Sequence, residues 1–214
     1  MNHEPHKGQP LLTTGAPLDK ATAVMIMLHG RGADAQSILT LAAELNRPDL
    51  AYLAPQAADS TWYPNRFLVP TRLNQPWLDS ALAALDSVVN RITAAGIPTE
   101  RLFLLGFSQG ACLTLEYAAR NAKRYGGVIG LSGGLIGADD EPRQDHGSFD
   151  GAPIFLGCSD TDFHIPAARV GRAADVLKSL GANVTIRLYP DMDHTVNEDE
   201  LAFVRDLIKN VPKT

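Results

Sequence analysis

A serine between glycines is the strongest chemical signal in the chain. Ser108 lies at the centre of the segment from Gly106 to Gly110, whose sequence GFSQG matches the pattern G-x-S-x-G. In that pattern the serine occupies a tight turn from a strand into a helix, where glycine tolerates strained backbone angles and close packing. An apolar run precedes the motif and a segment of helical character follows it. Ser108 is therefore predicted to be a nucleophile, rather than a serine that only caps the following helix.

A serine hydroxyl needs a positioned base to take its proton, usually a histidine with a carboxylate behind it. In proteins with this turn the three residues follow the chain order Ser, Asp or Glu, His. The order excludes the histidines before the serine, namely His3, His6 and His29. His146 falls in a long polar loop, where a solvated side chain is the simpler interpretation. His194 follows the last predicted strand, at the sheet edge where open α/β sheets bind ligands, and is predicted to be the base.

The supporting acid is expected after the preceding strand, in the segment from Gly157 to Pro166 that also contains His164. This segment offers Asp160 and Asp162, and spacing alone does not choose between them. Asp191 and Asp193 adjoin the predicted base on one loop, so their carboxylates would have difficulty reaching its Nδ1.

A glycine-rich turn, His29 to Asp34 (HGRGAD), follows the first long apolar strand and leads into a helix. Turns of this kind supply a backbone donor to the oxyanion of acyl transfer, because N–H groups are rigid and already aimed at the developing charge. The predicted oxyanion donors are the N–H groups of Arg31 and Gln109. A phosphate loop is disfavoured, since the Gly-Lys-Ser/Thr ending and dinucleotide-binding spacing are missing. The Arg31 side chain is interpreted as solvated rather than as a binder of acidic substrates.

Short apolar runs alternate with segments of helical period, which is typical of βαβ units around a mostly parallel sheet. Buried strands are predicted at 23–28, 50–54, 102–107, 128–131, 154–156 and 184–189, with an edge strand at 10–14. Apolar stripes at helical spacing predict helices around 38–45, 78–92, 173–180 and 201–211, besides the one after the serine. Segments 57–75 and 135–153 are predicted to be surface loops.

Length and composition predict one domain over residues 1–214, with residues 1–9 as a mobile tail. The two cysteines, Cys112 and Cys158, have no metal-site or disulfide spacing and are interpreted as core residues. No secretory signal or membrane-spanning run is evident, so a cytoplasmic protein without stable membrane insertion is expected. A net charge of −5 without a basic block argues against nucleic acid as a partner. No metal or organic cofactor is implied.

Several motifs together resemble the phospholipase/carboxylesterase family of small α/β-hydrolase-fold enzymes, which includes bacterial carboxylesterases and acyl-protein thioesterases. They are, in chain order, the His29 turn, Ala54-Pro55, Trp62-Tyr63, Gly106 to Gly110, Asp162 to Pro166 and Tyr189 to His194. The similarity runs over about Val24 to Val204. It implies a mostly parallel sheet of six or seven strands without a large cap, selects Asp162 as the acid, and suggests that the chain could form a homodimer.

The resemblance also indicates a substrate region. Trp62, Tyr63 and Phe163 are predicted to line the site for the acyl or alcohol group, although the aromatic pair could equally pack the loop. Many relatives carry an apolar residue where Arg31 stands, and thioesterases usually have aspartate where this chain has Pro64.

The sequence therefore predicts a serine carboxylesterase for small to medium acyl esters, with a small-molecule ester as its substrate. The alternatives are an acyl-protein thioesterase, a lysophospholipase-like hydrolase, and a small-molecule binding protein on the same scaffold.

Overall fold

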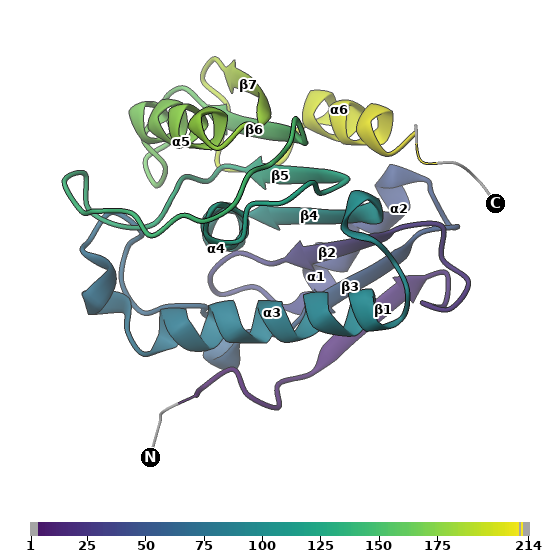
Figure 1. Ribbon diagram of the computed structural model, residues 1–214. Coiled ribbons are helices and arrows are strands. Elements are labelled where there is room, and N and C mark those ends of the chain that lie inside the picture. Colours follow the sequence, from purple (N-terminus) through teal and green to yellow (C-terminus); the bar gives the residue numbers. More distant parts are fainter. Residues whose placement is uncertain (1–3, 210, 212–214) are drawn as a thin grey trace.

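A seven-stranded sheet forms the centre of the molecule (Figure 1). The computed structural model describes residues 4–209 and residue 211. The strands are β1 (Leu11–Gly15), β2 (Val24–Leu28), β3 (Ala51–Pro55), β4 (Leu102–Phe107), β5 (Gly127–Leu131), β6 (Pro153–Ser159) and β7 (Asn183–Tyr189). Their order is β1-β3-β2-β4-β5-β6-β7, with β1 antiparallel to β3 and all other neighbours parallel. All six predicted strands and the predicted edge strand are present, and the mostly parallel α/β architecture is confirmed.

Six α-helices surround this sheet in the described part of the chain. They are α1 (Ala35–Leu39), α2 (Leu41–Leu45), α3 (Trp77–Ala94), α4 (Gln109–Arg120), α5 (Ala167–Ser179) and α6 (Glu198–Lys209). The single helix predicted around 38–45 is in fact two. At the junction the Thr40 N–H and the Thr40 hydroxyl both donate to the carbonyl of Ser37, three residues back, which tightens the turn and interrupts the helix.

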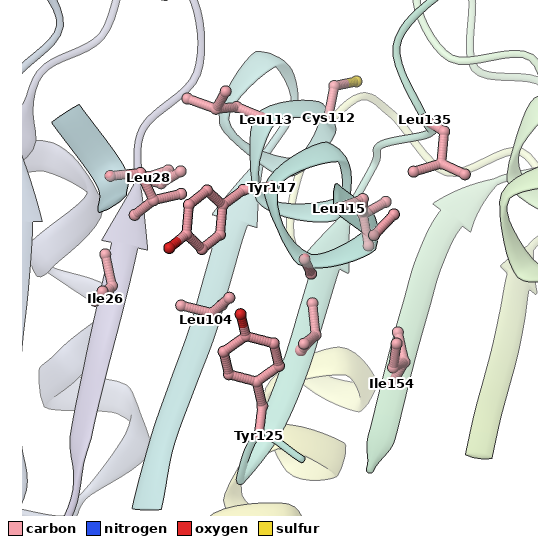
Figure 2. Packing of buried hydrophobic residues seen from close by; sticks show 14 of the residues in the cluster. Ile26, Leu28, Leu104, Cys112, Leu113, Leu115, Tyr117, Tyr125, Leu135 and Ile154 are labelled. Carbon is pink, nitrogen blue, oxygen red and sulfur yellow. The ribbon is translucent and has the colours of Figure 1, made fainter. Parts of the chain in front are cut away.

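Alternate residues of the central strands enter two separate cores, because successive strand side chains point to opposite faces. In β2, Ile26 and Leu28 pack with α3, α4 and α5, while Met25 and Met27 pack with α1, α2 and α6. Figure 2 shows the first core, where Tyr117 of α4 lies over these strands. Since both faces are covered, the central strands carry continuous apolar runs rather than an alternating pattern.

The strand β7 differs from the buried strand predicted for 184–189. It lies at the edge of the sheet, and Ile186 and Leu188 keep 37% and 45% of their surface exposed. An edge strand has only one hydrogen-bonded neighbour, so its side chains receive less cover than those of β4 or β5.

The N-terminal segment is packed onto the body, in contrast to the mobile tail predicted for residues 1–9. His6 is buried; its backbone N–H donates to Ser80 Oγ of α3, and its Nε2 donates to the carbonyl of Trp62. Its Nδ1 accepts the Ala58 N–H. Met1–His3 lie outside the described residues.

The segment from Ala57 to Gln75 contains two short 3₁₀ turns, Ala58–Ser60 and Thr71–Asn74, and its residues 63–67 line a cavity together with Ser108. No helix within the described residues is long and apolar enough to cross a membrane.

Candidate active site

Ser108 occupies a strained turn between β4 and α4. Its backbone has φ 55° and ψ −119°, a conformation that residues with a side chain rarely adopt. The flanking glycines make the turn possible. A Cβ on Gly106 would lie 2.3 Å from the Gly110 carbonyl oxygen, and a Cβ on Gly110 would lie 2.2 Å from the Leu28 carbonyl oxygen. The helix can therefore start directly against the ends of β2 and β4, which projects the serine at the carboxyl edge of the sheet.

The structure brings Ser108, His194 and Asp162 together from three different segments. His194 Nε2 lies 2.8 Å from Ser108 Oγ, and His194 Nδ1 lies 2.7 Å from Asp162 Oδ2. With the proton on Nδ1, the imidazole donates to the carboxylate and accepts from the serine hydroxyl. This tautomer leaves the imidazole free to take the serine proton.

The Asp162 carboxylate is held on both oxygens. Oδ1 accepts the N–H groups of His164 and Ile165 at 2.7 and 3.0 Å, and Oδ2 faces the imidazole. Burial alone would raise the pKa of Asp162, but the hydrogen bonds from His194 and from these two N–H groups outweigh it, and the pKa is lowered. The Asp162 side chain therefore remains an anion close to the His194 imidazole.

The other acids weighed from the sequence do not reach His194. Asp160, which spacing could not separate from Asp162, is exposed and accepts the Asp191 N–H through Oδ1. Asp191 and Asp193 are exposed as well, and in the described structure neither carboxylate bonds to the imidazole.

The glycine-rich turn lies beside Ser108. A Cβ on Gly30 would lie 3.4 Å from Ser108 Cβ, so the backbone of this turn passes next to the serine. Gln109 is the first residue of α4, where an N–H has no partner inside the helix. Among the described residues, no hydrogen bond uses the Arg31 or Gln109 N–H. Both N–H groups are therefore without a partner in the described structure, and their role as oxyanion donors stays a prediction.

Side chains of the same two residues fix the loop that faces Ser108. Arg31 is exposed, as expected, but its guanidinium also donates to the carbonyls of Tyr63, Pro64 and Asn65 at 2.7 to 2.9 Å and so clamps the loop. The Gln109 side chain accepts the Trp62 N–H at 2.9 Å and donates to the Tyr63 carbonyl at 2.7 Å. The loop path thus depends on the residues that also offer the two backbone donors.

A cavity of about 510 Å³ opens in front of Ser108 and His194. Of the three predicted substrate residues, Tyr63 lines it. Trp62 is 1% exposed and packs behind the loop, with its Nε1 donating to the His29 carbonyl, which matches the loop-packing alternative. Phe163 is 83% exposed and lies outside the cavity lining, with its ring edge against His164.

Several cavity residues were not predicted from the sequence. They include Arg66, Phe67, Cys112, His164 and Ile165. The position of Cys112, one turn after the nucleophile on α4, could have indicated it, because residues four apart share a helix face. Burial raises the pKa of the Cys112 thiol to about 11, so it is a neutral apolar wall. The others come from irregular loops, where no periodicity reports which way a side chain points.

Within residues 4–209 and 211, no cluster of three or more His, Cys, Asp or Glu side chains could hold a metal ion. Ser108, His194 and Asp162 bring a hydroxyl, an imidazole and a carboxylate together, with backbone donors beside them, a set suited to acyl transfer.

Comparisons with known proteins identify the family and the fold. A model of the Phospholipase/Carboxylesterase family matches residues 11–211. A crystal structure of a phospholipase/carboxylesterase from Dyadobacter fermentans is 42% identical, covering 95% of this chain and 97% of that one, with a TM-score of 0.92. Acyl-protein thioesterase 1 of Yarrowia lipolytica is 24% identical, covering 85% of this chain and 88% of that protein. Lysophospholipase-like protein 1 of Mus musculus is 25% identical, covering 90% and 88%. The chain thus has the α/β-hydrolase fold, belongs to the phospholipase/carboxylesterase family and is a hydrolase that acts on esters.

Proposed function

We propose that the protein is a serine carboxylesterase that hydrolyses small to medium acyl esters through an acyl-enzyme on Ser108. The observation that carries this proposal is the continuous pair of hydrogen bonds from Ser108 Oγ to His194 Nε2 and from His194 Nδ1 to Asp162. A serine whose proton can pass to a correctly oriented imidazole is an activated nucleophile.

In the first half-reaction, Ser108 Oγ attacks the ester carbonyl carbon while His194 Nε2 takes the hydroxyl proton. The carbonyl oxygen becomes an oxyanion, which the N–H groups of Arg31 and Gln109 stabilise. When the tetrahedral intermediate collapses, the carbon–oxygen bond to the alcohol breaks and His194 returns the proton to the departing oxygen. In the second half-reaction a water molecule attacks the acyl-enzyme with the same base, which releases the acid and regenerates the serine.

The Asp162 carboxylate acts by position and charge. It holds the proton on Nδ1 and stabilises the imidazolium that forms in each step, and it is not protonated itself. Its lowered pKa supports this role, because the anion persists at neutral pH.

The cavity supports the substrate size. Its volume of about 510 Å³ lies within the range of small-molecule sites, and Tyr63, Phe67, Cys112 and Ile165 give it apolar walls. Thioester cleavage is a second candidate, favoured by the likeness to a protein called acyl-protein thioesterase 1. It needs the same nucleophile and base, so only substrate choice separates the two.

Turnover of a panel of neutral esters and thioesters of increasing acyl length tests the proposal. We expect the oxygen esters of short and medium acids to be cleaved fastest. Ser108→Ala should reduce kcat/KM by several orders of magnitude and leave the circular dichroism spectrum unchanged. Retention of turnover by purified Ser108→Ala would contradict the proposal. Stoichiometric binding without turnover by the wild type would instead favour a binding protein.

A further inference from the structure

The active-site cavity is cationic although the protein is acidic. The chain has a net charge of −5, yet the cavity lining includes Arg31 and Arg66 and contains no Asp or Glu. The Asp162 carboxylate lies behind His194, where its side chain is fully buried and pairs with the imidazole. No ion pair to either arginine occurs within the part of the chain that the structure describes. The cavity therefore holds positive charge that the protein does not neutralise.

The two arginines differ in what their donors do. Arg31 uses both Nη atoms on three loop carbonyls, so its guanidinium is committed to the clamp. Arg66 is exposed and has only two long contacts, from Nη2 to the carbonyls of Phe163 and His164 at 3.4 and 3.5 Å. Contacts of that length are weak, and a guanidinium prefers the paired oxygens of a carboxylate or phosphate. The Arg66 guanidinium thus has hydrogen-bond donors available to bind a ligand in the cavity.

The backbone on both sides of Arg66 is fixed. The buried side chain of Asn74 accepts the Asn65 N–H at 2.8 Å and donates to the Arg66 carbonyl at 3.2 Å. The Asn65 side chain also donates to the Leu73 carbonyl at 2.7 Å. A ligand that binds the guanidinium therefore meets an arginine whose loop is already ordered, which lowers the entropy lost on binding.

Arg66 lies on the side of the base. The carbonyls that it contacts belong to Phe163 and His164, and the His164 ring lies 5.0 Å from the His194 ring, centroid to centroid. The imidazole must protonate the leaving alcohol, so the alcohol departs on this side.

We propose that Arg66 binds a negatively charged group, a carboxylate or a phosphate, in the alcohol part of the ester substrate. This inference rests on the proposed function and names the class of ester for which the site is built. Arg31 adds positive charge to the same cavity while holding the loop that carries Arg66.

Matched pairs of butanoyl esters test the inference. The carboxylate pair is the ester of para-hydroxybenzoate against that of para-hydroxybenzamide. The phosphate pair is the ester of hydroxypropyl phosphate against that of propanediol, and the two pairs distinguish the two sources of charge. We expect the anionic member of at least one pair to have a kcat/KM about 10- to 100-fold higher, the usual contribution of a charge-assisted hydrogen bond.

Variants assign that preference to the side chain. Arg66→Gln should abolish the preference, so that the anionic and neutral members of a pair have the same kcat/KM, and Arg66→Lys should retain part of the preference. Arg72→Gln is the matched control, because Arg72 is an exposed arginine nearby that lines a different cavity. It removes the same charge and should retain the full preference.

Three results would overturn the inference. A wild type that cleaves neutral esters without preferring either anion would contradict it and leave the proposed function standing. If Arg66→Gln lowered kcat/KM equally for the anionic and the neutral ester of a pair, Arg66 would only tether the 163–164 segment. A preference seen only when the carboxylate is in the acyl part, as in aryl monoesters of glutaric acid, would contradict the placement on the alcohol side. If no ester at all were cleaved, the proposed function itself would fail, and this inference with it.

Discussion

The structure distinguishes the two aspartates, Asp160 and Asp162, that spacing in the sequence left as equal candidates for the partner of His194. Asp162 and Asp160 stand two residues apart, yet one carboxylate is buried against His194 and the other faces solvent. The difference arises from the turn after β6, where the N–H groups of His164 and Ile165 capture Asp162 Oδ1 and aim its other oxygen at the imidazole.

Asp162→Asn should therefore reduce ester turnover strongly without unfolding the protein. The amide cannot accept the Nδ1 proton in the same way and carries no charge, so the imidazole loses its tautomer and the support of its cation. We expect kcat to fall on the order of 10³- to 10⁴-fold. Asp160→Asn is the control and should keep kcat within about 2-fold. Equal effects of the two changes would show that the assignment of the acid is wrong.

Some residues of the site could be predicted from the sequence and others could not. Ser108 and His194 were selected from a local motif and from chain order, and the structure places their side chains within hydrogen-bond distance. The choice of Asp162 and the burial of Trp62 depend on how irregular loops run, and no pattern of polarity encodes that path. Arg66 was not predicted for the same reason, since an exposed arginine in a loop looks like any solvated charge.

At the scale of elements, the contact between β2 and α4 positions Ser108. The helix starts so close to the strand that only a hydrogen atom fits at Gly110, whose Cβ would overlap the Leu28 carbonyl. This contact keeps the N-terminus of α4, with the Gln109 N–H, beside the glycine-rich turn.

Gly110→Ala should consequently destabilise the protein by about 1–3 kcal/mol, because the added methyl must push α4 away from the backbone of β2. Gly171→Ala provides the matched control. Gly171 also lies within a helix, α5, but nothing lies within 4 Å of its added Cβ, and alanine favours the helix by up to about 1 kcal/mol. Denaturant midpoints measure both. A Gly110→Ala protein as stable as the control variant would refute the close packing.

Elements were predictable where one physical rule dominates. Strands β2 to β6 are covered on both faces, so their uninterrupted apolar runs were sufficient to predict them from the sequence. The break at Thr40 was not predictable from the apolar stripe, because it arises from hydrogen bonds to the Ser37 carbonyl that leave the stripe intact. For β7, composition resembled that of a buried strand, while its exposure follows from its place at the sheet edge.

At the scale of the whole molecule, two buried histidines connect the N-terminal segment, the end of β2 and the loop that faces the site. His29 Nε2 accepts the Ala57 N–H, and His6 Nδ1 accepts the Ala58 N–H. Both imidazoles are neutral in this arrangement, and burial lowers the pKa of each. Protonation would remove the acceptor that holds each N–H.

This arrangement predicts a pH-dependent contribution of His6 to stability. Because its folded pKa lies below the ordinary value of 6.5, its contribution is complete above pH 6.5 and is lost as the pH falls below that value. Comparison with His6→Gln isolates the contribution of His6, because the amide cannot titrate in this range. The difference in unfolding free energy between the wild type and His6→Gln should therefore shrink as the pH falls. The pH dependence of the wild type alone would not isolate His6. Burial raises the pKa of Glu200 to about 7, so ionisation of Glu200 lowers the free energy of unfolding as the pH rises, which opposes the effect of His6.

Unfolding free energies of both proteins at pH 7.5 and pH 5.5 give the measurement, and His146→Gln, which changes an exposed histidine, serves as the control. A wild-type advantage that is constant with pH would contradict the neutral, buried His6. A single domain over residues 1–214, a homodimer and a cytoplasmic location stay predictions at this scale.

Activation of Ser108 by His194 underlies the whole proposed reaction. Its most direct test is to treat the wild-type protein and His194→Ala with a fluorophosphonate probe and to locate the adduct by peptide mass spectrometry. We expect labelling of the wild type at Ser108, at a rate that falls by orders of magnitude in His194→Ala while the fold is retained. Failure to label well-folded wild-type protein, or equal labelling of the variant, would contradict it.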